Sequence, residues 1–159
     1  MQTLLSIAAL AVVMVVGLAV HRHRSGLEGR HIDNEVDTVA LAVATDHLNR
    51  ASVLPFDDVA HVLDASVLTA PSAFGGAATW DDAADLDDVH GLTDSVVVAA
   101  HGRSLPYAVH TEVRYVALAG GAFVASAAQT PYKELTVTVD GPDGRRATLA
   151  RVYGCRFNA

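Results

Sequence analysis

The chain contains a single cysteine, Cys155, and a single lysine, Lys133, in a sequence of 159 residues. One thiol excludes an intramolecular disulfide, and it also excludes a zinc site built from several cysteines. We therefore expect Cys155 to be a small buried apolar residue near the C-terminus. A disulfide to another chain is the alternative.

Positive charge is scarce as well. Lysine and arginine together number 11, against 18 aspartate and glutamate residues, and the formal net charge is −7. Proteins that bind nucleic acid rely on clustered cations to neutralise phosphates. The composition therefore argues against nucleic acid as a partner.

Catalytic signatures are also missing. The sequence has no HExxH, GxSxG, P-loop or GxGxxG pattern. Ser104 lies close to His101, but such neighbours are common by chance. The other histidines of the domain have no paired metal-ligand spacing; they are His61, His90 and His110. We expect a protein that is not an enzyme and that has no organic cofactor.

One long apolar run is present, from Leu4 to Val20, and it contains no charge. As a helix it would reach across most of a hydrocarbon core of about 30 Å. The basic cluster His21–Arg24 ends it. We interpret the run as a transmembrane helix, with a cleaved secretory signal or a buried helix of a soluble core as alternatives. The positive-inside rule, applied alone, would place the following domain in the cytoplasm.

Helical periodicity continues after this run. From Ile32 to Val53 apolar residues recur at steps of three and four, while acidic residues occupy the opposite face. The helix is expected to end near Val53, because Pro55 disfavours the α conformation at Leu54. The apolar stripe is expected to pack on the core of the domain.

The C-terminal half shows the alternation that is typical of strands. The expected strands are Ser95–Ala100, Ala108–Ala117, Lys133–Val139 and Ala147–Tyr153. The sequence DGPDG at 140–144 joins the last two as a hairpin. The small apolar segment between Ala119 and Thr130 has no assignment.

These elements predict an α+β fold, in which a long N-terminal helix packs on a C-terminal antiparallel sheet of about four strands. The helix has a transmembrane half and an amphipathic half. Three parts follow: residues 1–24 as the transmembrane helix with its basic stop, residues 25–54 as the amphipathic helix, and residues 55–159 as a β-rich head with an acidic loop at 80–91.

The acidic loop is the strongest candidate for a site. Its carboxylates are hard oxygen ligands of the kind that Ca²⁺ prefers. The candidate calcium ligands are Asp81, Asp82, Asp85, Asp87 and Asp88. The spacing is not that of an EF-hand, and a solvated acidic loop or a local cap is the alternative. Asp57, Asp58 and Asp64 could contribute if the fold brings the segments together.

Three short motifs follow the two helical segments in order. They are LPFD at 54–57, DLDDVHGL at 85–92 and YKELTVTV at 132–139. With the apolar N-terminal run, they resemble the type IV pilin and pseudopilin group, and its minor-pilin members in particular. Members carry a glutamate within the apolar run, whereas this run has no acidic residue.

The resemblance implies a structural subunit or accessory of a cell-envelope filament, pilus or secretion assembly. Its partners would be the membrane and other pilin-like subunits, which would pack through Leu4–Val20. Its location would be the cytoplasmic membrane, crossed once, with the head outside the cytoplasm. The alternative function is a membrane-anchored or secreted binding domain whose acidic loop holds calcium.

Overall fold

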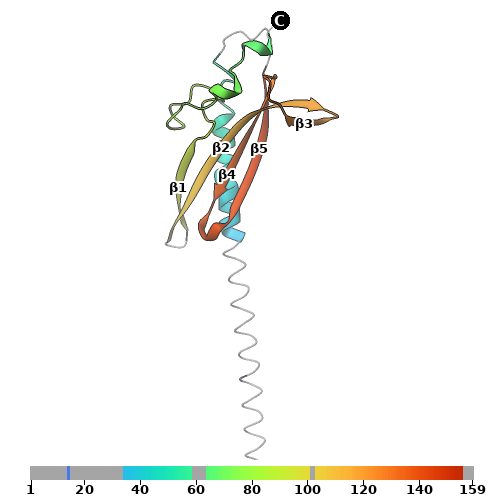
Figure 1. The fold of residues 1–159 in the computed structure, drawn as a ribbon. Coiled ribbons are helices and arrows are strands. Elements are labelled where there is room, and N and C mark those ends of the chain that lie inside the picture. Colours follow the sequence, from blue (N-terminus) through green and yellow to red (C-terminus); the bar gives the residue numbers. More distant parts are fainter. Residues whose placement is uncertain (1–13, 15–33, 59–63, 101–102, 156–159) are drawn as a thin grey trace, which may run out of the picture. The chain divides into compact units, whose positions relative to one another are not determined.

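The computed structural model describes residue 14 and residues 34–58, 64–100 and 103–155 (Figure 1). The residues from Asp37 onward form one compact unit. This unit consists of a helix, an antiparallel sheet and the long connection between them.

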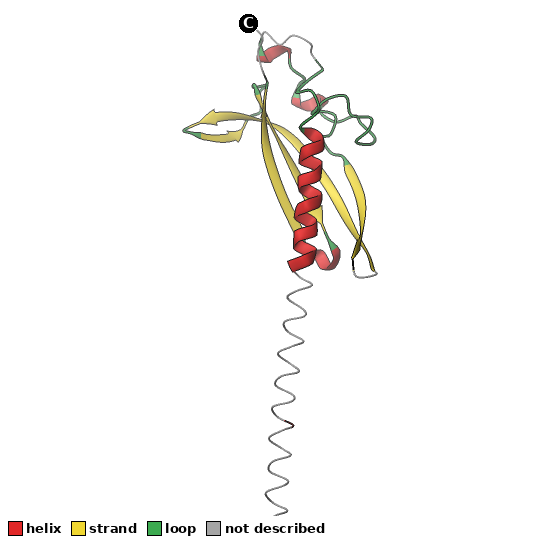
Figure 2. Ribbon diagram, turned by 180° about the vertical axis from the view of Figure 1, so that it is seen from behind, coloured by secondary structure: helices red, strands yellow, loops and turns green. Residues whose placement is uncertain are grey.

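A helix over residues 34–51 lies across one face of the sheet (Figure 2). Its buried face repeats at steps of three and four, as the sequence predicts; within the compact unit the face consists of Ala40, Val43, Ala44, His47, Leu48 and Ala51. The helix ends at residue 51, and Pro55 follows after two turn residues and Leu54. Tyr153 fixes the end of the helix to the sheet, because its hydroxyl donates to the carbonyl of Leu48 at 2.9 Å.

The sheet has five strands: β1 (Thr93–Ala100), β2 (Arg103–Ala119), β3 (Ala122–Ala125), β4 (Tyr132–Asp140) and β5 (Arg146–Gly154). Every pairing is antiparallel, in the order β1-β2-β4-β5, with β3 paired to β2 alone. The expected hairpin of the last two strands is confirmed, and the short 3-10 helix η3 (Pro142–Gly144) forms its connection.

The core lies on one face of β2 and β4. Along β4 the inner residues are Lys133, Leu135, Val137 and Val139, and all four have no exposed surface. Their partners across the ladder on β2 are Tyr115, Val113, Thr111 and Val109, respectively. Strict alternation therefore gives this pair of strands one buried face.

The connection between the helix and β1 contains two short 3-10 helices, η1 (Ala65–Val67) and η2 (Pro71–Ala73). Its remaining part is irregular but not loose, because several of its apolar side chains are buried: Leu68, Trp80, Leu86, Val89 and Leu92. Burial of these side chains fixes the acidic loop at 80–91, called the acidic segment from here on, against the sheet.

β3 was not expected from the sequence. β2 continues beyond its pairing with β4 and turns back at Gly120 and Gly121, whose φ angles are +61° and +84°. This left-handed conformation at two successive residues is that of a tight hairpin turn, which glycine adopts without strain. The β2–β3 hairpin projects from the sheet (Figure 1).

The predicted fold class is wrong in its main element. The structure describes one helix, over residues 34–51, and five strands rather than about four, and a long N-terminal helix is not seen. Among the described residues, no helix combines the length and the apolar character needed to cross a membrane. The expected transmembrane helix Leu4–Val20 lies outside the described residues except for Met14. The predicted location, a single-pass protein of the cytoplasmic membrane, is therefore not supported.

Candidate functional site

The only lysine of the chain is a buried residue of the sheet. Lys133 occupies the inner face of β4, two residues before Leu135, and no part of it is exposed. A buried ammonium group loses its hydration and is stable only where protein groups replace the water. The surroundings of its Nζ atom therefore define the candidate site.

Three oxygen atoms from two distant segments surround this ammonium group. Nζ donates to the backbone carbonyl of Phe56 at 2.7 Å and to Oδ2 of Asp57 at 3.0 Å. It also forms an ion pair with Oδ1 of Asp87. Both carboxylates are almost fully buried, so little solvent screens either pair.

Asp57 is held in place by a threonine from the loop after η1. The backbone N–H of Thr69 donates to its Oδ2 at 2.9 Å, and the Thr69 hydroxyl donates to its Oδ1 at 3.1 Å. Burial alone would raise the pKa of Asp57, but the hydrogen bonds from Thr69 and Lys133 outweigh it and hold the pKa below the ordinary value. Asp57 is thus an ionised carboxylate with both oxygens occupied.

Asp87 has fewer hydrogen-bond donors around it than Asp57. Burial raises its pKa to about 6, although the hydrogen bond and the charge of Lys133 act in the opposite direction. Its Oδ2 has no hydrogen-bond partner within the described part of the chain. One oxygen of this carboxyl group is therefore paired with the lysine, and the other is buried without a donor.

Asp85 completes the cluster and shapes the backbone around it. Its Oδ1 accepts from the backbone N–H groups of Asp87 at 2.8 Å and Asp88 at 3.2 Å. Burial raises its pKa, and those two N–H groups partly offset the rise. The turn that Asp85 closes directs Asp87 toward the lysine.

Backbone hydrogen bonds dock the acidic segment onto its neighbours. The N–H of Leu86 donates to the carbonyl of Pro55 at 3.0 Å, and the N–H of Gly75 donates to that of Asp87 at 2.9 Å. The N–H of Gly91 donates to the carbonyl of Thr111 on β2, also at 2.9 Å. The motifs LPFD and DLDDVHGL are therefore in direct contact, and both meet YKELTVTV at Lys133.

Aromatic rings form the remaining walls. The Nζ atom of Lys133 lies 4.3 Å from the ring centre of Phe56, 5.3 Å from that of Tyr115 and 5.5 Å from that of Phe74. Tyr115 is fixed by its hydroxyl, which donates to the carbonyl of Thr69 at 2.8 Å. Ring faces attract the cation and keep water away from it.

The cluster could hold a metal ion, since Asp57, Asp85 and Asp87 each offer an oxygen atom and these atoms lie within 4.8 Å of one another. Only two of the five predicted ligands, Asp85 and Asp87, belong to it. The ammonium group of Lys133 stands between two of the three carboxylates, where a bound cation would otherwise be placed.

The other acidic residues serve separate local contacts. Asp81 is exposed and pairs with Arg50 at 3.2 Å, Asp82 accepts from the hydroxyl of Thr79 at 2.7 Å, and Asp88 accepts from the N–H of Ala84 at 2.9 Å. Asp64 caps η1 by accepting from the N–H of Ser66 at 3.2 Å, and Asp58 is exposed. The fold does not bring these five residues into one cation site.

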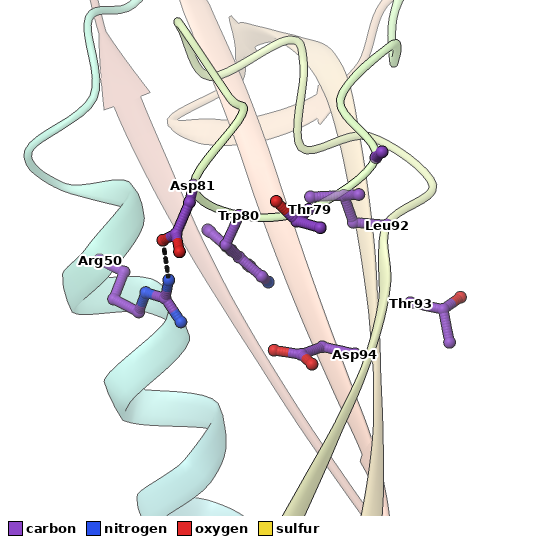
Figure 3. Close-up of a pocket in the computed structure, with 8 residues that line it drawn as sticks. Arg50, Thr79, Trp80, Asp81, Leu92, Thr93 and Asp94 are labelled. Carbon is purple, nitrogen blue, oxygen red and sulfur yellow. Dashed lines mark hydrogen bonds and ion pairs between the residues drawn. The ribbon is translucent and has the colours of Figure 1, made fainter.

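A shallow cavity of about 230 Å³ lies beside the helix, apart from this cluster. Figure 3 shows its lining, in which Arg50 reaches Asp81 next to Trp80. The Trp80 ring is buried against His47 and Arg50, and its Nε1 has no hydrogen-bond partner among the described residues. This ring fixes the acidic loop to the helix.

Three histidines lie in the described part of the chain and make separate contacts; the Nε2 atom of His47 lies 3.4 Å from Oδ2 of Asp94. His61 and His101 lie outside the described residues. His90 accepts from the N–H of Val113 at its Nδ1 atom, and His110 is exposed beside Thr93.

The sequence analysis named Asp85 and Asp87 as candidate ligands and Asp57 as a conditional addition, but it missed Lys133, which contacts both Asp57 and Asp87. The signal was available, because Lys133 continues the inward alternation of Leu135 and Val137. Comparison of the chain with protein-family models, with curated proteins and with solved structures found no match.

Proposed function

We propose that this protein is a pilin-like structural subunit or accessory of a filament or secretion assembly, with a role in assembly rather than in catalysis. Its partners are other subunits of the same kind. The observation that carries the proposal is the β2–β3 hairpin, which leaves the sheet and presents apolar side chains to solvent.

The hairpin has the composition of a contact surface. Leu118, Phe123 and Val124 are exposed over 60%, 43% and 47% of their surface. Phe123 packs on one side against Tyr132, with ring centres 5.2 Å apart, and its remaining surface is open. Apolar side chains clustered on a projecting arm mark protein interaction sites more often than isolated exposed ones.

The backbone of the hairpin also offers an unused edge. Within the described residues, β3 pairs with β2 and with no other strand. A short edge strand with free N–H and C=O groups can accept a strand from another chain. Strand addition and apolar contact at the same arm would join two copies of the subunit.

The resemblance gains support from the three motifs that suggested it. LPFD, DLDDVHGL and YKELTVTV are far apart in sequence, yet their Asp57, Asp87 and Lys133 meet in one buried cluster. These contacts hold the three motifs together in the core of the head.

The test is self-association of the full chain with and without the arm. The double variant Leu118→Asp and Phe123→Asp should dissociate oligomers seen by light scattering. The matched control is Val97→Asp, since Val97 is an exposed apolar residue on β1, away from the arm. Equal association of wild type, arm variant and control would contradict the proposal.

A second candidate function is calcium binding by Asp57, Asp85 and Asp87. The observation that favours it is the unpartnered Oδ2 of Asp87 next to two further carboxylates. Calcium takes six to eight oxygen ligands at about 2.3–2.6 Å, and it would have to displace the ammonium group of Lys133.

Thermal unfolding with added Ca²⁺ and with EDTA tests this second function. Binding to the folded state alone raises Tm. Lys133→Met removes the competing ammonium group and should enlarge the rise in Tm that Ca²⁺ causes. Mg²⁺ is the control ion. An unchanged Tm in both proteins would contradict calcium binding by this cluster.

A further inference from the structure

Lys133 and Asp87 differ from an ordinary surface ion pair in their burial. Both side chains are withdrawn from water, and their charged atoms are in direct contact. Two buried ions carry a desolvation penalty that their attraction does not always repay. A covalent bond between the two groups would remove both charges and thereby the penalty.

We propose that Lys133 and Asp87 become joined by an intramolecular amide bond between Nζ and Cγ, with Asp57 as the proton carrier. The bond would link β4 to the acidic segment. This inference does not depend on the proposed role in assembly, because it concerns the interior of a single chain.

The reaction balances without an oxidant or a further reactant. Transfer of a proton from the ammonium group to Asp87 gives a free amine and a carboxylic acid. The amine lone pair attacks Cγ of Asp87, and the new C–N bond forms. Asp57 takes a proton from the nitrogen and passes it to the departing hydroxyl group. One C–O bond breaks, one water molecule leaves, and Asp57 is again a carboxylate.

The geometry assigns the two aspartates to different roles. Asp57 accepts a hydrogen bond from Nζ at 3.0 Å, which is the contact that a proton carrier requires. Its oxygens are also held by Thr69, so its carboxylate form is favoured. Asp87 has an oxygen without a hydrogen-bond donor in the described part of the chain, and this oxygen is the one free to leave.

Protonation supports the same assignment. A carboxylate resists attack by an amine, whereas a neutral carboxylic acid can lose its hydroxyl group as water. Nζ of Lys133 and the carboxyl group of Asp87 are in direct contact and withdrawn from water, so proton transfer between them removes two buried charges and gives the neutral acid. The acid formed by this transfer is thus the group in contact with the nucleophile.

The walls of the cluster favour condensation over hydrolysis. The rings of Phe56, Phe74 and Tyr115 surround Nζ, and Lys133 has no exposed surface. Loss of water from an amine and an acid is unfavourable in dilute aqueous solution. A dry site that holds the two groups in contact reverses this balance, because the product water departs and does not return.

The experiment exploits the single lysine of the chain. The full-length protein is purified, fully denatured and weighed by intact mass spectrometry. It is then treated with a lysine-specific endoprotease, for which Lys133 is the only possible cleavage site. The expected result is a mass lower by one water molecule and a chain that stays uncut. A full mass with a single cut after Lys133 would overturn the proposal.

Two variants locate the bond. In Asp87→Asn the same attack expels ammonia in place of water, so the mass deficit should change from one water to one ammonia. In Asp57→Asn the proton carrier is lost, and freshly purified protein should show the full mass. A deficit that stays one water in Asp87→Asn would contradict the assignment to Asp87.

Peptide mapping identifies the two residues that the bond joins. Tryptic digestion should give one species in which the peptide with Asp87 is joined to a peptide still spanning Lys133. A mass deficit in a chain that is still cut after Lys133 would indicate dehydration elsewhere and would overturn the proposal. A bond from Lys133 to Asp57 or Asp85 would also overturn the proposal.

Discussion

Tyr115 and Lys133 lie opposite each other on the inner faces of β2 and β4, and the ring centre of the tyrosine is 5.3 Å from Nζ of the lysine. The neighbouring pair on the same two faces, Val113 and Leu135, is apolar and buried. The apolar core of the sheet therefore ends in a charged cluster, and the acidic segment covers that end.

The hydroxyl of Thr69 is predicted to stabilise the ionised form of Asp57. Thr69→Val keeps the shape of the side chain but removes the donor at 3.1 Å from Oδ1. Hydrogen bonds to charged groups contribute about 1.5–3 kcal/mol, so we expect a loss of about 2 kcal/mol in urea unfolding. Thr148→Val on β5 is the control, because its contact to Thr138 is exposed and 3.4 Å long. Equal losses in the two variants would contradict a special role for Thr69.

Close packing of the loop against the acidic segment predicts a difference between two glycines. Gly75 has φ +86°, and a Cβ atom there would lie 2.9 Å from the backbone oxygen of His90. Gly91 has φ +76°, but no atom lies within 4 Å of its Cβ position. Gly91→Ala should cost about 1–2 kcal/mol for the left-handed backbone alone.

Gly75→Ala should cost more, because the backbone of the acidic segment must also move. The measurement is the free energy of unfolding of both variants by urea, with the m-value checked for two-state behaviour. A Gly75→Ala variant that is as stable as Gly91→Ala would show that the two segments are not packed as described.

The pKa of Asp87 predicts a dependence of stability on pH wherever its carboxyl group is free. Asp57→Asn provides this state. In the intact cluster burial raises the pKa of Asp87 to about 6, and the charge of Asp57 adds to the rise. Burial remains in Asp57→Asn, so the folded state of this variant still holds the proton more tightly than the unfolded state does. The stabilisation is complete below about pH 4 and is lost as pH rises through the folded pKa of Asp87.

Several groups face Asp87 and set the size of this effect. In Asp57→Asn they are Lys133 from β4, Tyr115 from β2 and Asp85 from its own segment, because the charge of Asp57 is removed. The measurement is urea unfolding of Asp57→Asn at pH 4, 5, 6 and 7, compared with the Asp57→Asn and Asp87→Asn double variant. The stability of the double variant should not fall between pH 4 and pH 7. If it still falls, another group is responsible.

Much of the sheet could be predicted from local pattern. Alternation along β2 and β4 reflects one buried face, and the Gly/Pro/Asp turn between β4 and β5 sets their register. β3 was missed because the segment around it is made of small apolar residues with no alternation of burial; all four of its residues are exposed.

The site was less predictable, for a physical reason. Asp57 and Lys133 are 76 residues apart, and no periodicity within one element relates them. The acidic residues were noticed as a group of similar charge, which suggested a cation from solution. The cation at the centre is a side chain, and only the inward alternation of β4 could have indicated that Lys133 points toward the core.

Lys133 is enclosed between Asp57 and Asp87, and the reactivity of its amine tests this arrangement most directly. The native full-length chain is treated with an amine-reactive acetylating reagent, digested and mapped by mass spectrometry. Because Lys133 is the only lysine, one peptide carries the result. We expect no acetylation of Lys133 in the native chain while the N-terminal amine reacts. Acetylation of Lys133 at the rate of an exposed lysine would show that the cluster does not exist.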